Sequence, residues 1–231
     1  MARNQMADAA RRTVATSEFE SEPCPRRHCT IVAEADHRIA NHLAMLAGQV
    51  HLRAAELACQ ADAPNRESVC LLLLGLEAEI SAVARLHRLL SAGGSKASAD
   101  LADQLHEVCA TINTGVSGAV VVEDLSRGHV VDAELLLPVT QIVAEVITNA
   151  VKHAYPAGKG TILVSLREVG AGKTVIEVVD HGSGFPPGFD PLRGGGLGFR
   201  VVRALAKQIH AVATFQSSGL GVRFQLALPP V

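Results

Sequence analysis

Tryptophan is absent from this sequence of 231 residues, and one tyrosine with six phenylalanines brings the aromatic share to only 3%. An excess of either charge is missing as well, because 21 basic and 23 acidic residues give a formal net charge of −2. Without a basic excess, nothing in the composition indicates nucleic acid as a partner. The 48% of hydrophobic residues exclude a wholly disordered chain. A core of this chain must therefore be built from leucine, valine, isoleucine and alanine.

Long hydrophobic runs are also missing. No apolar stretch approaches the roughly 18 to 20 residues that cross a membrane, and the run Leu71–Leu74 is interrupted at once. The N-terminus carries arginines but no apolar segment typical of a signal peptide. Among the five cysteines, Cys24 and Cys29 with His28 have no second cluster to complete a tetrahedral metal site, so we expect reduced thiols. These absences predict a soluble, cytoplasmic protein without membrane contact.

Changes in composition divide the sequence into four segments. Residues 1–28 are polar and contain two prolines, which predicts a flexible tail. Residues 29–92 are rich in alanine and leucine at helical spacing. Residues 93–98 are mainly glycine and serine, which is typical of a short linker. Residues 99–231 mix strand and helix patterns and predict a separate domain.

The second segment has the pattern of a helical hairpin. One apolar stripe runs from Ile31 to about Gln60 and another from Val69 to Leu90, and Pro64 and Asn65 mark a turn between them. Two antiparallel helices leave each apolar stripe half uncovered. We therefore expect two copies to pair in a four-helix bundle, which makes the protein a homodimer.

The pattern of residues 99–231 predicts an α+β sandwich, in which helices cover one face of a sheet. Long helices are expected at 135–153 and 197–210. Two strands joined as a hairpin are expected at 161–167 and 174–180. The other expected elements are a helix at 99–111 and strands at 119–123, 213–216 and 222–227.

A polar stripe lies along the long helix of this domain. Asn149 follows Glu145 by four residues, and Lys152 and His153 follow Asn149 by three and four, so all four share one face. Burying such a stripe is costly unless something pairs with it. A divalent cation with phosphates would do so, since an amide oxygen suits Mg²⁺, a carboxylate can hold a metal-bound water, and lysine and histidine donate to phosphate. A solvated helix face explains the stripe equally well.

A carboxylate and two glycines follow a predicted strand in Asp180-His-Gly182-Ser-Gly184. A carboxylate at a strand end can accept a hydrogen bond from an exocyclic amine such as that of adenine. The glycines let the backbone turn sharply and approach a flat ligand. A tight turn containing aspartate is the simpler explanation of this segment alone.

A second glycine-rich loop opens the helix that begins at Leu197. Gly194, Gly196 and Gly198 surround this helix start, where free backbone N–H groups and the helix dipole favour an anion. The loop lacks the preceding βαβ unit of a dinucleotide-binding fold and the Gly-Lys-Ser/Thr of a P-loop. The later segment around Gly219 and Gly221 is explained by a hairpin turn.

The order and spacing of these motifs resemble the ATP-binding module of histidine kinases and of the wider superfamily with gyrase, Hsp90 and MutL. The resemblance implies that Asn149 ligates Mg²⁺, that Asp180 holds the adenine amine, and that Glu145 takes part in catalysis. It also makes Gly184–Gly194 the nucleotide lid. The implied cofactors are ATP and Mg²⁺. The implied nucleotide-binding set is Asn149, Lys152, His153, Asp180, Gly182, Gly184, Gly194, Gly196, Leu197 and Gly198.

The first predicted helix carries a candidate acceptor for the phosphoryl group. The segment His37-Arg-Ile-Ala-Asn41-His42 is similar to the His-Arg-hydrophobic-x-Asn pattern of a second subclass of histidine kinase dimerisation domains. The match makes His37 the phosphoacceptor, and a largely neutral imidazole near pH 7 is a suitable nucleophile. His42 points to another face and is the alternative acceptor. Asp36 stands where many relatives have histidine, which leaves the general base open.

The resemblance implies a histidine kinase without its own sensor domain. It would transfer the γ-phosphoryl group of ATP to its own histidine and then to an aspartate of a response regulator, with an upstream sensor protein as a further partner. The alternative is an ATP-independent phosphotransfer or docking scaffold with a degenerate kinase domain. A third candidate is a regulator-binding serine kinase of the anti-sigma type, but the predicted helical hairpin at residues 31–90 counts against it.

Overall fold

The computed structural model describes residues 40–230 except 42, 45, 56, 59–65, 92–97, 116–118, 156–158 and 171. The chain separates into two compact units, Met1–His37 and Arg38–Val231. The first unit lies outside the described residues, and with it the predicted tail and the candidate acceptor His37. The predicted linker also lies outside them, apart from Ser98. The predicted domain boundaries therefore stay predictions.

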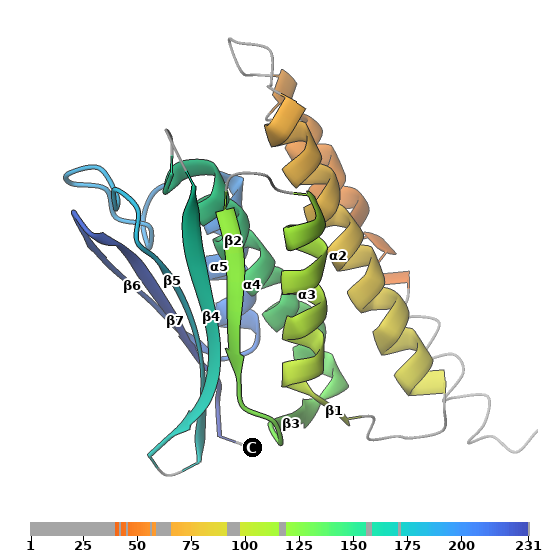
Figure 1. Ribbon diagram of the computed structural model, residues 1–231. Coiled ribbons are helices and arrows are strands. Elements are labelled where there is room, and N and C mark those ends of the chain that lie inside the picture. The colour runs from red at the N-terminus through yellow and green to blue at the C-terminus, as the bar shows by residue number, and fades with distance from the viewer. Residues whose placement is uncertain are drawn as a thin grey trace, which may run out of the picture. The chain divides into compact units, whose positions relative to one another are not determined.

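The C-terminal half is built on a five-stranded sheet (Figure 1). Its strands are β2 (Ala119–Leu125), β4 (Gly160–Val169), β5 (Lys173–Asp180), β6 (Val212–Ser218) and β7 (Gly221–Ala227). Their order is β2-β4-β5-β7-β6, with antiparallel hairpins at β4–β5 and β6–β7 and a parallel pair at β2–β4. Alternate residues of β4, namely Ile162, Val164 and Leu166, are fully buried, so one face of the sheet lines the core.

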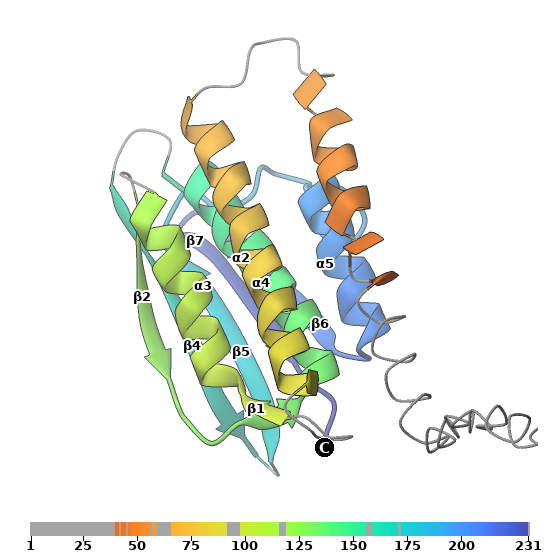
Figure 2. The ribbon, with the colours of Figure 1, turned by 90° about the vertical axis from the view of Figure 1, so that its right-hand side faces the viewer.

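Three helices cover this face of the sheet (Figure 2): α3 (Leu101–Gly115), α4 (Ala133–His153) and α5 (Leu197–Gln208). The central helix α4 buries Ile142, Val143 and Ile147 completely. It connects β3 (Val130–Asp132), which follows β2, to β4, so it belongs to the crossover that a parallel strand pair requires. The predicted α+β sandwich is confirmed.

A small second sheet was not expected from the sequence. β1 (Ser98–Asp100) pairs antiparallel with β3 (Val130–Asp132), and each strand has only three residues. Asp100 accepts hydrogen bonds from the N–H groups of Gly128 (2.9 Å) and Ala102 (3.0 Å). The bond from Gly128 lowers the pKa of the Asp100 carboxyl. These contacts fix the entry into α3.

The predicted helices of the second segment are present in the described residues. Helical residues lie between 40 and 58, and we call them the N-terminal helix. The second is α2 (Arg66–Ser91), which packs against both α3 and α4 (Figure 2). Because the structure holds one chain, the four-helix bundle of two copies stays a prediction.

Helix α4 is also the one helix in the described part of the chain that is long and apolar enough to cross a membrane. The segment concerned is Glu134–His153, and 78% of its apolar 18-residue window is buried inside the protein. Its apolar character is thus accounted for by its place between the sheet and α2, as the core helix of the domain.

Candidate functional site

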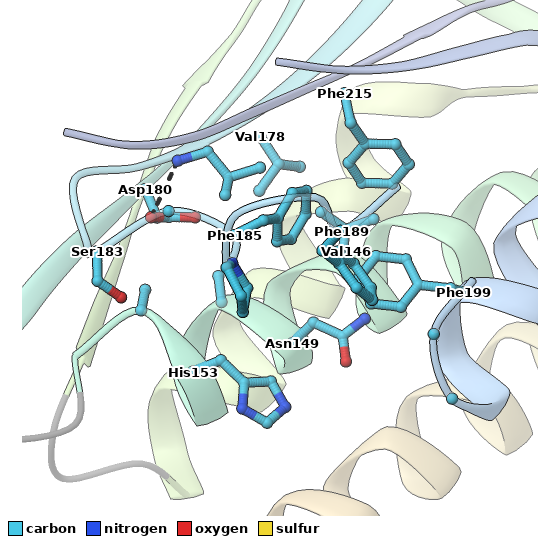
Figure 3. Close-up of a pocket in the computed structure, with 17 residues that line it drawn as sticks. Val146, Asn149, His153, Val178, Asp180, Ser183, Phe185, Phe189, Phe199 and Phe215 are labelled. Atoms are coloured by element: carbon cyan, nitrogen blue, oxygen red, sulfur yellow. Dashed lines mark hydrogen bonds between the residues drawn. The ribbon is translucent and has the colours of Figure 1, made fainter. Parts of the chain in front are cut away.

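A cavity of about 450 Å³ opens beside the C-terminal half of α4 (Figure 3). Its other walls come from the end of β5, the loop between β5 and α5, the start of α5, and the last two strands. Most lining side chains are apolar. The polar side chains among them are Asn149, His153, Asp180 and Ser183. An apolar pocket with a few convergent polar groups is typical of a small-molecule site.

Asp180 is the buried acid of the cavity, and only 7% of it is exposed. Its Oδ1 accepts hydrogen bonds from the N–H groups of Gly182 (2.9 Å) and Val222 (3.3 Å), and Figure 3 shows the second of these. Within the described residues, no group donates to its Oδ2. The protein thus fixes one oxygen of this carboxylate and leaves the other for a ligand.

Close backbone contacts around Asp180 require glycine. A Cβ on Gly182 would collide with the carbonyl oxygen of Ala154, and a Cβ on Gly221 would collide with that of Asp180 itself. Gly184 and Gly221 also have φ values of +71° and +122°, which favour glycine. The sequence indicated Gly182 and Gly184 as site residues, but it explained Gly221 only as part of a hairpin turn. Gly184 lines the cavity, whereas Gly182 acts through its N–H bond to Asp180.

The polar stripe of α4 divides between two environments. Asn149 and His153 line the cavity, and Lys152 is exposed outside its lining. The Nδ2 of Asn149 is buried and has no hydrogen-bond partner in the described part of the chain. Desolvation, with the nearby charge of Lys152, lowers the pKa of His153, so its imidazole is neutral at pH 7. Asn149 therefore presents an unsatisfied polar atom where a ligand would bind.

Glu145, a predicted catalytic residue, is not among the residues that line the cavity. The residue is 6% exposed, and its carboxylate forms an ion pair with Arg53 of the N-terminal helix. On its other side it faces the start of α5, since a Cβ on Gly198 would lie 2.7 Å from Glu145 Oε2. The structure thus places this acid between the N-terminal helix and the second glycine loop.

The second glycine loop contributes backbone to the cavity. Gly195 and Gly196 line it, and Gly196 is the residue that caps the N-terminus of α5. The other predicted members, Gly194, Leu197 and Gly198, do not line it, and Leu197 is buried. Gly195 was missed from the sequence. Its φ of +90° and the ring of Phe199 against its Cβ position both require glycine.

The sequence analysis also missed a cluster of phenylalanine rings. Four of the six phenylalanines line the cavity, and their ring centroids lie 5.2 to 6.0 Å apart in tilted or edge-on pairs. Phe224 extends the cluster, because its ring centroid is 4.8 Å from that of Phe215. Such rings give a flat, apolar wall suited to an aromatic ligand. The lining rings are those of Phe185, Phe189, Phe199 and Phe215 (Figure 3).

Comparison with known proteins identifies the domain around this cavity. Residues 135–231 match the family described as histidine kinase-, DNA gyrase B- and HSP90-like ATPases. The match covers less than half of the chain and shows what these residues are similar to. The matched range contains Asn149, Asp180 and both glycine loops. All residues that line the cavity beside α4 lie within this matched range.

The chain is similar in sequence to proteins named as histidine kinases. It is 29% identical over 207 residues to blue-light-activated histidine kinase 2 of Erythrobacter litoralis, which covers 86% of this chain and 56% of the relative. It is 24% identical over 177 residues to the sensor histidine kinase PdtaS of Mycobacterium tuberculosis, which covers 75% of this chain and 34% of that protein. The chain thus spans about half or less of the length of these relatives.

A solved structure has the same fold over most of the chain. The histidine kinase domain of a blue-light-activated histidine kinase from Erythrobacter litoralis superposes with a TM-score of 0.65. The match covers 89% of this chain and 94% of that domain at 24% identity. This similarity extends beyond the ATPase domain and includes helical residues that precede it.

Proposed function

We propose that the protein is an ATP-dependent histidine kinase that phosphorylates His37 and transfers the phosphoryl group to an aspartate of a response regulator. The cavity carries this proposal, since a free carboxylate oxygen of Asp180 and an unpartnered amide nitrogen of Asn149 both belong to it. Support for the reaction class comes from the relatives, which are named as histidine kinases.

The residues of the cavity fit ATP. Asp180 Oδ2 can accept a hydrogen bond from the adenine amine, and the phenylalanine rings offer the base an apolar wall. The phosphates would lie toward α5, where Gly196 precedes the free N–H groups of the first helical turn. His153 is neutral at pH 7, so it would donate a hydrogen bond without adding charge.

The residues also fit Mg²⁺ that is bound mainly through phosphates and water. The described residues contain no cluster of three or more histidine, cysteine, aspartate or glutamate side chains that could hold a metal by themselves. Mg²⁺ usually keeps several waters and takes few protein ligands beside substrate phosphates. Asn149 would be the protein ligand, and the ion would neutralise charge on the transferring phosphoryl group.

The acceptor step depends on His37, which lies outside the described residues. A neutral imidazole nitrogen would attack the γ-phosphorus, the N–P bond would form as the bond to ADP breaks, and the imidazole would lose its N–H proton to the general base or to water. The regulator aspartate would then displace the imidazole. Positioning the nucleophile in line would supply most of the rate enhancement.

The hairpin offers an apolar surface for the proposed homodimer. On the N-terminal helix, Leu43 and Val50 are exposed and seven residues apart, and on α2 Leu73 and Ile80 repeat the same spacing. This is the spacing of a helix–helix seam. A second copy of the chain would cover these four side chains in a four-helix bundle. The cytoplasmic location and an upstream sensor partner remain parts of the proposal.

One observation favours the ATP-independent scaffold as a second candidate. Glu145, to which the resemblance in the sequence assigned a catalytic role, is paired with Arg53 and does not line the cavity. A scaffold would not need this carboxylate at the nucleotide. Measurement of Mg²⁺-dependent ATP binding separates the two candidates, because the scaffold predicts no binding.

The kinase proposal is tested with γ-labelled ATP and Mg²⁺. Wild type should gain label that is stable in base and labile in acid, and His37→Ala should not. His42→Ala is the matched control, because its imidazole is five residues away on another helix face, and it should label as wild type does. A wild type that binds ATP without gaining label, or equal labelling of the His37→Ala variant, would contradict the proposal.

A further inference from the structure

Two polar contacts join the N-terminal helix to α4. Gln141 Nε2 donates a hydrogen bond to Gln49 Oε1 at 3.2 Å, and four residues further along both helices Arg53 pairs with Glu145. All four side chains are more than nine-tenths buried. A buried ion pair adds little net stability, since both charges lose their water, and its best-known uses are to fix register or to act in a switch.

Helix α2 leaves room for this ion pair. Gly75 is buried in the interior of α2, and a Cβ there would lie 3.8 Å from Arg53 Nη1. Glycine inside a helix costs roughly 0.5 to 1 kcal/mol relative to alanine. A longer side chain at this position would extend toward the guanidinium. A Cβ at this distance is in ordinary van der Waals contact, so only a side chain longer than that of alanine would press on Arg53.

The two contacts also fix the direction of the N-terminal helix. Because Gln49 pairs with Gln141 and Arg53 with Glu145, this helix runs parallel to α4. The cavity lies against the opposite, C-terminal half of α4, from Val146 onward. The contacts thus bring the N-terminal helix against the middle of α4, just before the residues that line the cavity.

We propose that Arg53 is a positioning residue that ties the N-terminal helix to α4 and competes with bound Mg²⁺ for the Glu145 carboxylate. This inference rests on the proposed function. Glu145 lies one helical turn before Asn149, so Mg²⁺ bound at Asn149 would attract the carboxylate that Arg53 now holds. Nucleotide binding and the Arg53–Glu145 pair would then weaken each other, because coupling between two sites is reciprocal.

The test uses the full chain with Arg53→Gln, with Arg53→Lys as the charge-conserving variant. Arg127→Gln is the matched control, since it removes an exposed arginine–carboxylate pair with Asp103. Hydrogen exchange of residues 46–55 is measured with and without the non-hydrolysable analogue AMPPNP and Mg²⁺, and analogue affinity is measured by calorimetry. In wild type and in Arg127→Gln, the analogue should speed this exchange several-fold.

In Arg53→Gln, residues 46–55 should exchange rapidly without nucleotide, and the affinity for the analogue should be at least about five-fold higher than in wild type. Arg53→Lys should give values between those of wild type and Arg53→Gln. If Arg53→Gln does not fold, the double variant with Glu145→Gln removes both charges, and the analogue should then leave its exchange unchanged. The proposal would be overturned if the analogue left the hydrogen exchange of wild type unchanged, or if Arg53→Gln bound the analogue no more tightly than wild type. It would also be overturned if the analogue still changed the exchange of the double variant. A wild type that responds but gains no label at His37 would contradict the kinase reaction alone.

Discussion

The backbone of Gly221 at the start of β7 lies against the carbonyl of Asp180 at the end of β5, so closely that a side chain on Gly221 would overlap it. In the same stretch of β7, the N–H of Val222 donates a hydrogen bond to Asp180 Oδ1. The acid of the cavity is therefore held by the strand beside it. The position and the charge of Asp180 can be tested separately.

Gly221→Ala should displace Asp180. The substitution adds a collision and a φ of +122° that alanine rarely adopts, which together should cost about 1 to 3 kcal/mol or more of unfolding free energy. Denaturant unfolding measures this cost, and analogue binding should weaken as well. Gly219→Ala, in the same turn but with open space around its Cβ position, should be nearly neutral in both measurements. Equal effects of the two variants would refute the role given to Gly221.

Asp180→Asn should weaken ATP binding while the fold is retained. The amide oxygen can still accept from Gly182 and Val222, but the second acceptor for the adenine amine becomes a donor. We expect a loss of about 1 to 3 kcal/mol, or roughly 5- to 150-fold in affinity. Calorimetry with ATP and Mg²⁺ provides the measurement. Asp124→Asn, which changes an exposed pair with Arg167, should bind as wild type does.

His153 should make the protein less stable in mild acid. Its pKa is lowered in the folded state by desolvation and by Lys152, so below the ordinary value near 6.5 the unfolded chain binds more protons at this residue. Its effect on stability should therefore become unfavourable as the pH falls from about 6.5 through the folded pKa. Comparison of wild type and His153→Gln by unfolding at pH 7.5 and 5.5 should show a smaller acid loss in the variant.

His106 gives a control of opposite sign for that measurement. Its hydrogen bond and charge interaction with Glu123 raise its pKa, so its stabilising contribution is complete below about 6.5 and is lost as the pH rises through the folded value. His106→Gln should thus lose more stability, relative to wild type, at pH 5.5 than at 7.5. The same sign for both histidines would contradict the assignment.

Arg203 of α5 should control the mobility of residues 184–194, the segment predicted to be the nucleotide lid. Its Nη1 donates to the carbonyl oxygens of Pro191 and Gly194, both at 2.7 Å, and so ties the end of the lid to the helix. Arg203→Ala should speed hydrogen exchange across residues 184–194 several-fold and leave β4 unaffected. Arg193→Ala, which removes an exposed arginine of the lid paired with Asp190, should change this exchange little. Unchanged hydrogen exchange of residues 184–194 in Arg203→Ala would show that these two hydrogen bonds do not restrain the segment.

Periodic elements of the fold could be predicted from the sequence. The apolar spacing of α4, which buries Ile142 and Ile147, and the alternation in β4 are strong local signals. The pair β1–β3 could not be found, since strands of three residues carry almost no pattern. The motif spacing led to Asn149 and Asp180, which line one cavity although they come from a helix and a strand.

What the sequence could not provide are the contacts between distant segments. Arg53 and Glu145 are 92 residues apart, and neither local pattern indicates the other. The phenylalanine cluster unites rings from the lid, α5 and two strands. The scarcity of aromatic residues was visible from the start, but their convergence depends on tertiary structure. Gly195 was missed because its positive φ follows from the path of the loop, which residue type alone does not specify.

The lone tyrosine stands at the edge of this site. The hydroxyl of Tyr155 accepts a hydrogen bond from the N–H of His181, next to Asp180, and donates one to the carbonyl oxygen of Thr161. Because the chain has no tryptophan, all of its intrinsic ultraviolet fluorescence beyond that of phenylalanine originates from this one phenol. Any rearrangement that breaks either bond changes an optical signal from a single known place, so events at this corner can be followed in solution without attaching a dye.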